Sequence, residues 1–238
     1  MKKVKTTKVT KTTETVTTIK TSKISKKMEE TEIVVVLDRS GSMQSISQAA
    51  VDGFNELLNE QQNAEGVAFM TLVQFDDRYE MNYQSVPVND VKPLILNETF
   101  VPRGSTALLD AIGKTIEELK TDRDVVFVII TDGQENASRI YKHDAISKII
   151  ETQTNEGWKF LFLAAGQDAI KTGGSIGISA ANSMNWSANK MSAKSTFSSV
   201  SSNVKSYRSG KFANLSLDDL DDISQKLTFT EKQREDSK

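Results

Sequence analysis

The chain has 238 residues, a formal net charge of −2 at pH 7 and no cysteine. That length is enough for one α/β domain with extensions, and the lack of cysteine excludes disulfides, thiolate zinc sites and a cysteine nucleophile in this sequence. Residues 1–30 carry nine Lys and three Glu, whereas the remainder has a net charge of −8, which argues against nucleic-acid binding by the folded part.

Residues 1–30 are rich in Lys and Thr and have only scattered apolar side chains. Such a segment cannot bury enough surface to form a core, so we predict a disordered tail. A basic arm that contacts a polyanion or an acidic partner is the alternative. Neither a signal peptide nor an apolar run of transmembrane length is present, so we expect a cytoplasmic protein with no membrane partner.

From Ile33 onward the pattern alternates between strands and helices. The run from Ile33 to Leu37 is apolar throughout, which is typical of a strand buried on both faces. Residues 79–86 instead alternate apolar and polar side chains after the short turn at 76–78, which predicts an antiparallel hairpin at a sheet edge. Strands are expected at 33–37, 67–75, 79–86, 125–130, 158–163 and 183–187, and helices at about 44–62, 107–119, 143–154, 168–175 and 189–207.

This alternation predicts an α/β fold: a doubly wound, mostly parallel six-stranded sheet with one antiparallel edge strand and helices on both faces. We expect the first strand to be central, with the strand at 125–130 beside it and a crevice at their carboxyl ends. The domain is expected to span 31–207. The remaining segment, 208–238, should be an extension with a short acidic helix (Leu217, Leu220, Ile223 and Leu227) and a frayed, charged end.

Oxygen-bearing side chains gather in three loops at this predicted crevice. The first loop carries Asp38, Ser40 and Ser42, the second carries Thr106, and the third carries Asp132. Carboxylates and hydroxyls are hard ligands that suit Mg²⁺, Mn²⁺ or Ca²⁺ rather than zinc. Ordinary turns and helix caps are the alternative interpretation of such strings, and Asp38 and Ser42 could also cap the first helix.

Two glycines accompany these ligands, Gly41 in the first loop and Gly133 in the third. We expect them to let the backbone turn sharply beside the ion. Asp76 and Asp77 at the end of the second strand are interpreted as hairpin-turn residues, and Asp168 as a helix cap.

The spacing Asp-x-Ser-x-Ser, followed by a distant Thr and a distant Thr-Asp-Gly, resembles a von Willebrand factor type A domain with a metal-ion-dependent adhesion site. The resemblance covers about residues 32–188, and the segment Gly166-Gln167-Asp168-Ala169 resembles stand-alone bacterial and phage members. It implies that Ser40, Ser42 and Thr106 bind the metal directly, and that Asp38 and Asp132 act mostly through waters. It also implies a partner protein that supplies an Asp or Glu.

These features predict a divalent-metal-dependent protein-interaction module, with Mg²⁺ as the expected ion and Mn²⁺ or Ca²⁺ possible. Ser105, Glu135 and Asn136 are candidates for a rim that contacts the partner, although a solvated loop explains Glu135 and Asn136 equally well. One alternative is a Mg²⁺-dependent phosphohydrolase with Asp38 as nucleophile. Such enzymes need a second acid two residues on, where this chain has Ser40. The other alternative is a basic-armed adaptor on a polyanion.

Overall fold

The computed structural model describes residues 30–165, 168–211 and 223–238. The predicted disordered tail therefore lies outside the described residues apart from Glu30, as does the first half of the predicted acidic helix. Among the described residues, no helix combines the length and the apolar character needed to cross a membrane.

A single six-stranded sheet forms the centre of the fold, with the strand order β3-β2-β1-β4-β5-β6. Neighbouring strands are parallel except for β2 and β3, which form the antiparallel hairpin at one edge. The predicted fold class is confirmed, including the central first strand beside the strand that ends near residue 130. The strands are β1 (Glu30–Asp38), β2 (Val67–Phe75), β3 (Tyr79–Pro87), β4 (Asp124–Thr131), β5 (Lys159–Ala165) and β6 (Ser183–Trp186).

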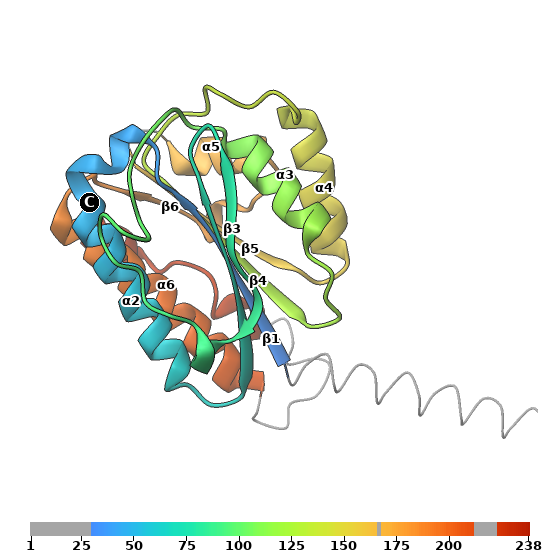
Figure 1. The fold of residues 1–238 in the computed structure, drawn as a ribbon. Helices are drawn as coiled ribbons and strands as arrows, with labels where there is room; N and C mark the ends of the chain where they lie inside the picture. The colour runs from blue at the N-terminus through green and yellow to red at the C-terminus, as the bar shows by residue number, and fades with distance from the viewer. Residues whose placement is uncertain (1–29, 166–167, 212–222) are drawn as a thin grey trace, which may run out of the picture.

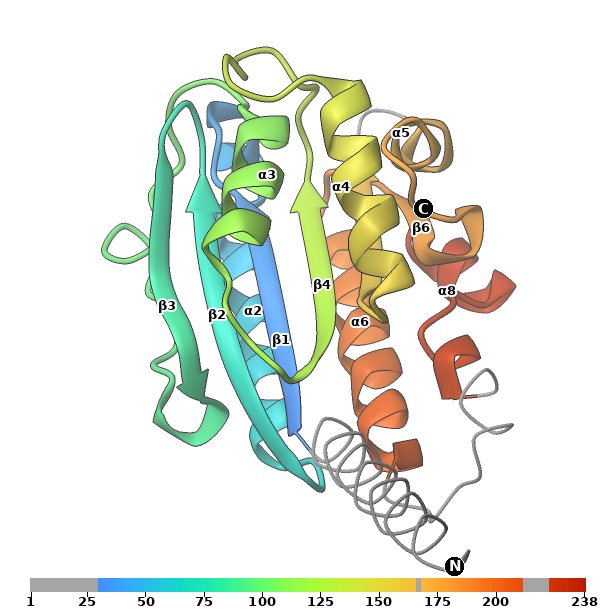
Figure 2. The ribbon, with the colours of Figure 1, turned by 90° about the vertical axis from the view of Figure 1, so that its right-hand side faces the viewer.

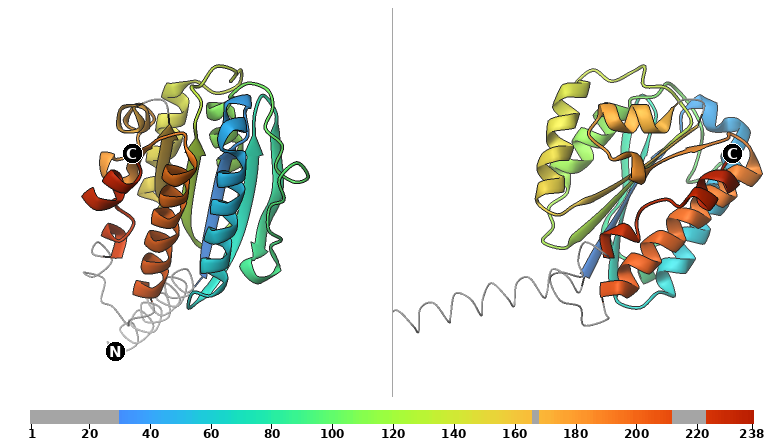
Figure 3. Two further views of the ribbon diagram at one scale, coloured as in Figure 1. Left: turned by 90° about the vertical axis from the view of Figure 1, so that its left-hand side faces the viewer. Right: turned by 180° about the vertical axis from the view of Figure 1, so that it is seen from behind.

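Helices cover both faces of the sheet. In Figure 1 the sheet is seen nearly edge-on, with α2 and α6 on one side and α3 and α4 on the other. Figure 2 views the α3 and α4 side, and the left panel of Figure 3 views the opposite side, with α2 and α6 in front. The helices are α2 (Ser47–Gln62), α3 (Leu108–Glu118), α4 (His143–Asn155), α5 (Ala169–Ser175), α6 (Lys190–Lys211) and α8 (Glu231–Asp236), with 3₁₀ turns η1 (Gly41–Ile46), η2 (Val88–Asp90) and η3 (Ala180–Asn182).

Strand β1 is buried on both faces, as its unbroken apolar run predicts. Its side chains alternate between two cores, so Val34 and Val36 pack toward α3 and α4, whereas Val35 and Leu37 pack toward α2 and α6. A shift of β1 along the sheet would disrupt the close packing of both cores, so its carboxyl end at Asp38 is firmly placed.

The C-terminal segment packs against the domain, and the prediction of a frayed end is wrong. Helix α6 continues past the expected end at 207, and the buried Arg208 donates to the carbonyl oxygens of Gln61 and Gly66, both at 2.9 Å. Arg234 donates to the carbonyl oxygen of Ser183, and Ser237 Oγ donates to that of Asn185. These contacts cover the edge strand β6, whose unpaired carbonyls would otherwise be open to pairing with another chain.

Close packing of α2 on α6 depends on Gly53, because a Cβ atom there would overlap the buried Phe197 ring. We expect Gly53→Ala to lower the free energy of unfolding by about 1–3 kcal/mol through overpacking, despite the better helix propensity of Ala. Urea unfolding measures the change. Gly174→Ala in α5 is the matched control, since a Cβ there meets nothing within 4 Å. Equal stability of the Gly53 and Gly174 variants would contradict the packing described for this contact.

Candidate metal centre

The predicted ligands lie where β1 and β4 end side by side. Leu37 pairs with Ile130 in the parallel register, so Asp38 and Thr131 follow at the same level. The Thr131 hydroxyl donates to Asp38 Oδ2, and the backbone N–H of Ser40 donates to Asp38 Oδ1 at 2.6 Å. Asp38 is therefore fully buried and held at both oxygens.

Three hydroxyl groups from two loops face a common space. Ser40 Oγ lies 3.0 Å from Ser42 Oγ, and Ser42 Oγ donates to Asp132 Oδ1 at 2.6 Å. A Cβ atom on Gly133 would lie 2.6 Å from Thr106 Oγ1, 3.3 Å from Ser42 Oγ and 3.4 Å from Ser40 Oγ. The structure thus brings all five predicted ligand residues together.

The donors around this space fit a hard divalent cation. They are two carboxylates and three hydroxyls, the oxygen ligands that Mg²⁺ and similar ions prefer. No group of three or more His, Cys, Asp or Glu suited to a metal ion occurs among the residues that the structure describes, so an ion here would depend on the hydroxyls. Gly133 leaves the space between them open.

The reason for Gly133 differs from the one predicted. We expected Gly41 and Gly133 to allow a sharp backbone turn, yet neither is among the glycines with positive φ. Gly133 is required because a side chain would fill the space that the hydroxyls surround. Gly104, in the loop that carries Thr106, is the glycine at this site with a left-handed backbone (φ +67°).

Both carboxyl groups of the site are unfavourable as bare anions. Burial raises the pKa of Asp38 to about 6, against the opposing hydrogen bonds from Thr131 and Ser40. Burial also raises the pKa of Asp132, although the hydrogen bond from Ser42 opposes it. A cation would offset this desolvation, because a buried charge needs a compensating partner.

In metal-free buffer, we expect Asp38→Asn to remove part of the pH dependence of stability. The pKa of Asp38 is about 6 in the folded chain, against an ordinary value of 3.8. The folded state therefore binds this proton more tightly than the unfolded chain. As the pH rises from about 4 to about 6, the free energy of unfolding of the native chain should fall by up to about 3 kcal/mol. Urea unfolding at several pH values measures this loss. The exposed Asp90→Asn is the control, and parallel curves for the native chain and Asp38→Asn would contradict the expectation.

Gly133→Ala tests the space itself. The new Cβ would push Thr106 Oγ1 away and occupy the position between the hydroxyls, so we expect Mn²⁺ affinity to fall at least about tenfold. The backbone is not left-handed, so the metal-free chain should still fold, although the overlap with the buried Thr106 should lower its melting temperature somewhat. Isothermal titration calorimetry measures the affinity, with Gly174→Ala as control. Native-like affinity in Gly133→Ala would show that the ion, if bound, lies elsewhere.

The residues predicted to form the rim behave differently from one another. Ser105 is exposed and stays a candidate for contact with a partner. Glu135 instead accepts hydrogen bonds from the backbone of Leu109 and Ser138, and Asn136 Oδ1 accepts one from the N–H of Thr106 at 2.9 Å. Both side chains thus hold the loop of Thr106 and the start of α3, which the solvated-loop interpretation did not anticipate.

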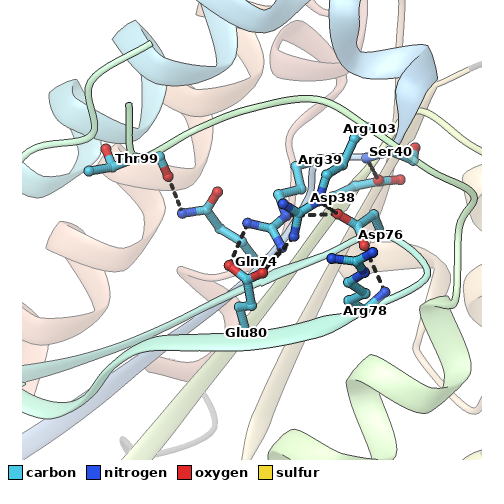
Figure 4. Close-up of polar contacts among 9 residues, drawn as sticks. All are labelled: Asp38, Arg39, Ser40, Gln74, Asp76, Arg78, Glu80, Thr99 and Arg103. Carbon is cyan, nitrogen blue, oxygen red and sulfur yellow. Dashed lines mark hydrogen bonds and ion pairs between the residues drawn. The ribbon is translucent and has the colours of Figure 1, made fainter. Parts of the chain in front are cut away.

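A cluster of two arginines and two carboxylates beside the site was missed by the sequence analysis. Arg39, Asp76, Glu80 and Arg103 are drawn in Figure 4. Asp76 does form the predicted turn, since its Oδ1 accepts from the N–H of Arg78, but its Oδ2 also binds Arg39 and Arg103. The available signal was Arg39 itself, a cation between two ligands and directly after a buried strand, which requires an acidic partner.

The other weaker predictions concern α5. Asp168 caps this helix as predicted, with its side chain accepting from the N–H of Lys171. Gly166 and Gln167, which contributed to the resemblance to bacterial and phage proteins, lie outside the described residues.

Comparison with known proteins shows which family and which solved folds this chain resembles. Residues 33–134 match the model of the von Willebrand factor type A domain. This match covers less than half of the chain, and it agrees with the resemblance suggested by the spacing of the predicted ligands. No curated protein sequence matches the chain.

Solved structures of the same fold include proximal thread matrix protein 1 from the mussel byssus, with 17% identity and a TM-score of 0.54 over 72% of this chain and 45% of that one. Another structure of the mussel protein, described as having a zinc-occupied MIDAS motif, shares 16% identity over 82% of this chain and 45% of that one, with a TM-score of 0.51. A von Willebrand factor type A protein from Catenulispora acidiphila shares 12% identity over 75% and 43%, with a TM-score of 0.51. This chain thus spans less than half the length of these proteins.

Proposed function

We propose that this protein is a divalent-metal-dependent interaction module whose bound ion accepts a carboxylate from a partner protein. The observation that carries the proposal is the convergence of the Ser40, Ser42 and Thr106 hydroxyls beside Gly133, next to two carboxylates. Domains of this family generally serve as interaction modules, and a mussel protein of the same fold has a structure described with zinc in its MIDAS motif.

The proposed ligands leave a role for an outside acid. Ser40, Ser42 and Thr106 contribute neutral oxygens, so the two aspartates supply all of the negative charge. Asp38 already accepts hydrogen bonds at both oxygens, which favours action through waters and leaves the ion poorly neutralised. A bound divalent cation would supply a Lewis-acidic position, and a partner's Asp or Glu is a favourable ligand for it. We propose Mg²⁺ as the ion, with Mn²⁺ or Ca²⁺ as substitutes.

The phosphohydrolase alternative gains no support. A nucleophilic aspartate must approach the phosphorus atom, but Asp38 is fully buried and both of its oxygens are engaged. The position two residues on is Ser40, so a general acid is lacking there as well. The basic-armed adaptor depends on residues 1–29, which lie outside the described residues, and it stays a hypothesis.

Metal binding by the native chain is the first test. We expect Mg²⁺ and Mn²⁺ to raise the melting temperature, with about 2.7 kcal/mol of stabilisation at a concentration 100 times the dissociation constant. Asp38→Ala should fold and show no such rise, whereas Asp77→Ala, which changes an exposed carboxylate near the site, should respond like the native chain. A melting temperature of the native chain that ignores both ions would contradict the proposal.

The partner's carboxylate is the second test. Affinity capture with the native chain and Asp38→Ala in parallel, followed by mass spectrometry, identifies proteins that need the metal site. EDTA should release such a protein from the native chain. Replacing its contacting Asp or Glu by Asn or Gln should abolish binding, and unchanged binding after each such replacement would exclude a carboxylate as the ligand.

A further inference from the structure

We propose that Arg39, Asp76, Glu80 and Arg103 act as positioning residues that hold the Thr106 loop against the loop of Asp38, Ser40 and Ser42. This inference rests on the proposed metal function, since it assigns the cluster a role in presenting the ligands. None of the four side chains belongs to the ligand set. The cluster instead joins the β2–β3 hairpin to both loops.

The cluster has alternating charges and paired contacts (Figure 4). Asp76 Oδ2 accepts from Arg39 Nε at 3.0 Å and from Arg103 Nε at 2.8 Å. Glu80 binds the outer nitrogens of the same two guanidinium groups, with Arg39 Nη1 at 2.8 Å and Arg103 Nη2 at 2.5 Å. Each arginine therefore bridges the two carboxylates, and each carboxylate bridges the two arginines.

Two side chains of this cluster are buried, and the other two are partly exposed and can be replaced with less risk to the fold. The side chains of Arg39 and Asp76 are 5% and 0% exposed, whereas those of Arg103 and Glu80 are 39% and 44% exposed. Hydrogen bonding to Arg39 and then to Arg103 lowers the pKa of Glu80 to about 2, so this carboxylate stays ionised at neutral pH. Arg39 remains paired with two carboxylates when Arg103 is removed, so that variant should fold.

Backbone hydrogen bonds connect the residues of the cluster to the loops that carry the ligands. The N–H of Arg103 donates to the carbonyl oxygen of Arg39 at 2.8 Å, and the N–H of Gly41 donates to that of Gly104 at 3.1 Å. The N–H of Ala107, directly after Thr106, donates to the carbonyl oxygen of Asp76 at 2.9 Å. The segment 103–107 is thus fixed to the first ligand loop and to the end of β2.

Hydrogen bonds with the loop of Asp132 hold Thr106 from the other side. Its N–H donates to Asn136 Oδ1, and its carbonyl oxygen accepts from the N–H groups of Asn136 and Ala137. The Asn136 contacts join Thr106 to the loop of Asp132, and the arginine cluster joins it to the loop of Ser40. Without the cluster, only backbone hydrogen bonds would hold the Thr106 loop against the loop of Ser40.

Arg103→Gln tests this role in the full chain with Mn²⁺ as the probe. We expect Mn²⁺ affinity to fall about tenfold, in the range typical of residues that orient metal ligands. Hydrogen exchange at the Arg103-loop amides, residues 103–107, should accelerate relative to β4. Arg103→Lys should bind with intermediate affinity, because an ammonium group cannot bridge both carboxylates as a guanidinium does.

The matched control is Arg78→Gln, which removes the same charge from an exposed side chain of the same hairpin. It should retain native affinity. Native-like Mn²⁺ binding by Arg103→Gln would overturn the inference, and so would faster exchange spread equally over β4, since that pattern indicates global destabilisation. If the native chain itself binds no Mn²⁺, the metal proposal fails, and the exchange pattern of Arg103→Gln still decides whether the cluster holds the loop.

Discussion

Two parallel strands that end at the same level organise the whole site. Strands β1 and β4 are hydrogen-bonded neighbours whose side chains pack closely in both cores, so sliding one strand past the other would disrupt that packing. Asp38 and Thr131 consequently meet at their carboxyl ends. The chain continues in opposite directions across the sheet from this pair of strands, with β2 and β3 on one side and β5 and β6 on the other. Doubly wound sheets place their ligands at such a reversal, outside the carboxyl ends of the strands.

The charged groups at the ends of β1 and β4 favour the binding of a cation. The site gathers two carboxyl groups in a region where burial raises both of their pKa values. Cations are nevertheless close by, since Arg39 lies between Asp38 and Ser40 in the sequence, yet its charge is directed to Asp76 and Glu80. The neighbouring ion-pair cluster is therefore neutral in itself, and among the described residues neither Asp38 nor Asp132 forms an ion pair with a Lys or Arg. The two aspartates are thus left to a bound cation, since a buried charge needs a compensating partner.

Much of this arrangement could be predicted from the sequence because it follows from local patterns. The unbroken apolar run of β1 indicates a central strand, and the alternating polarity of β3 indicates an edge hairpin. The ligand types and their placement after strands indicate a hard metal ion at the sheet's carboxyl edge.

Contacts between residues far apart in the sequence could not be predicted from such local patterns. The pairing of Arg103 with Asp76, and the hydrogen bond from Thr106 to Asn136, join residues far apart in the chain, and neither leaves a periodic signal. The charged C-terminal end was predicted to fray, but Arg234 donates to the carbonyl oxygen of Ser183 at the edge of the sheet and to that of Ala180 in η3. The role of Gly133 also depends on the three hydroxyls that face it, which the sequence does not place.

The central claim is that three separate loops place their oxygens around one divalent cation beside Gly133. A crystal structure of the native chain grown with Mn²⁺, with an anomalous difference map at the manganese edge, tests it most directly. We predict one strong peak within bonding distance of the hydroxyl oxygens of Ser40, Ser42 and Thr106. A map without a peak at that position, or with manganese held only by other residues, would contradict the claim.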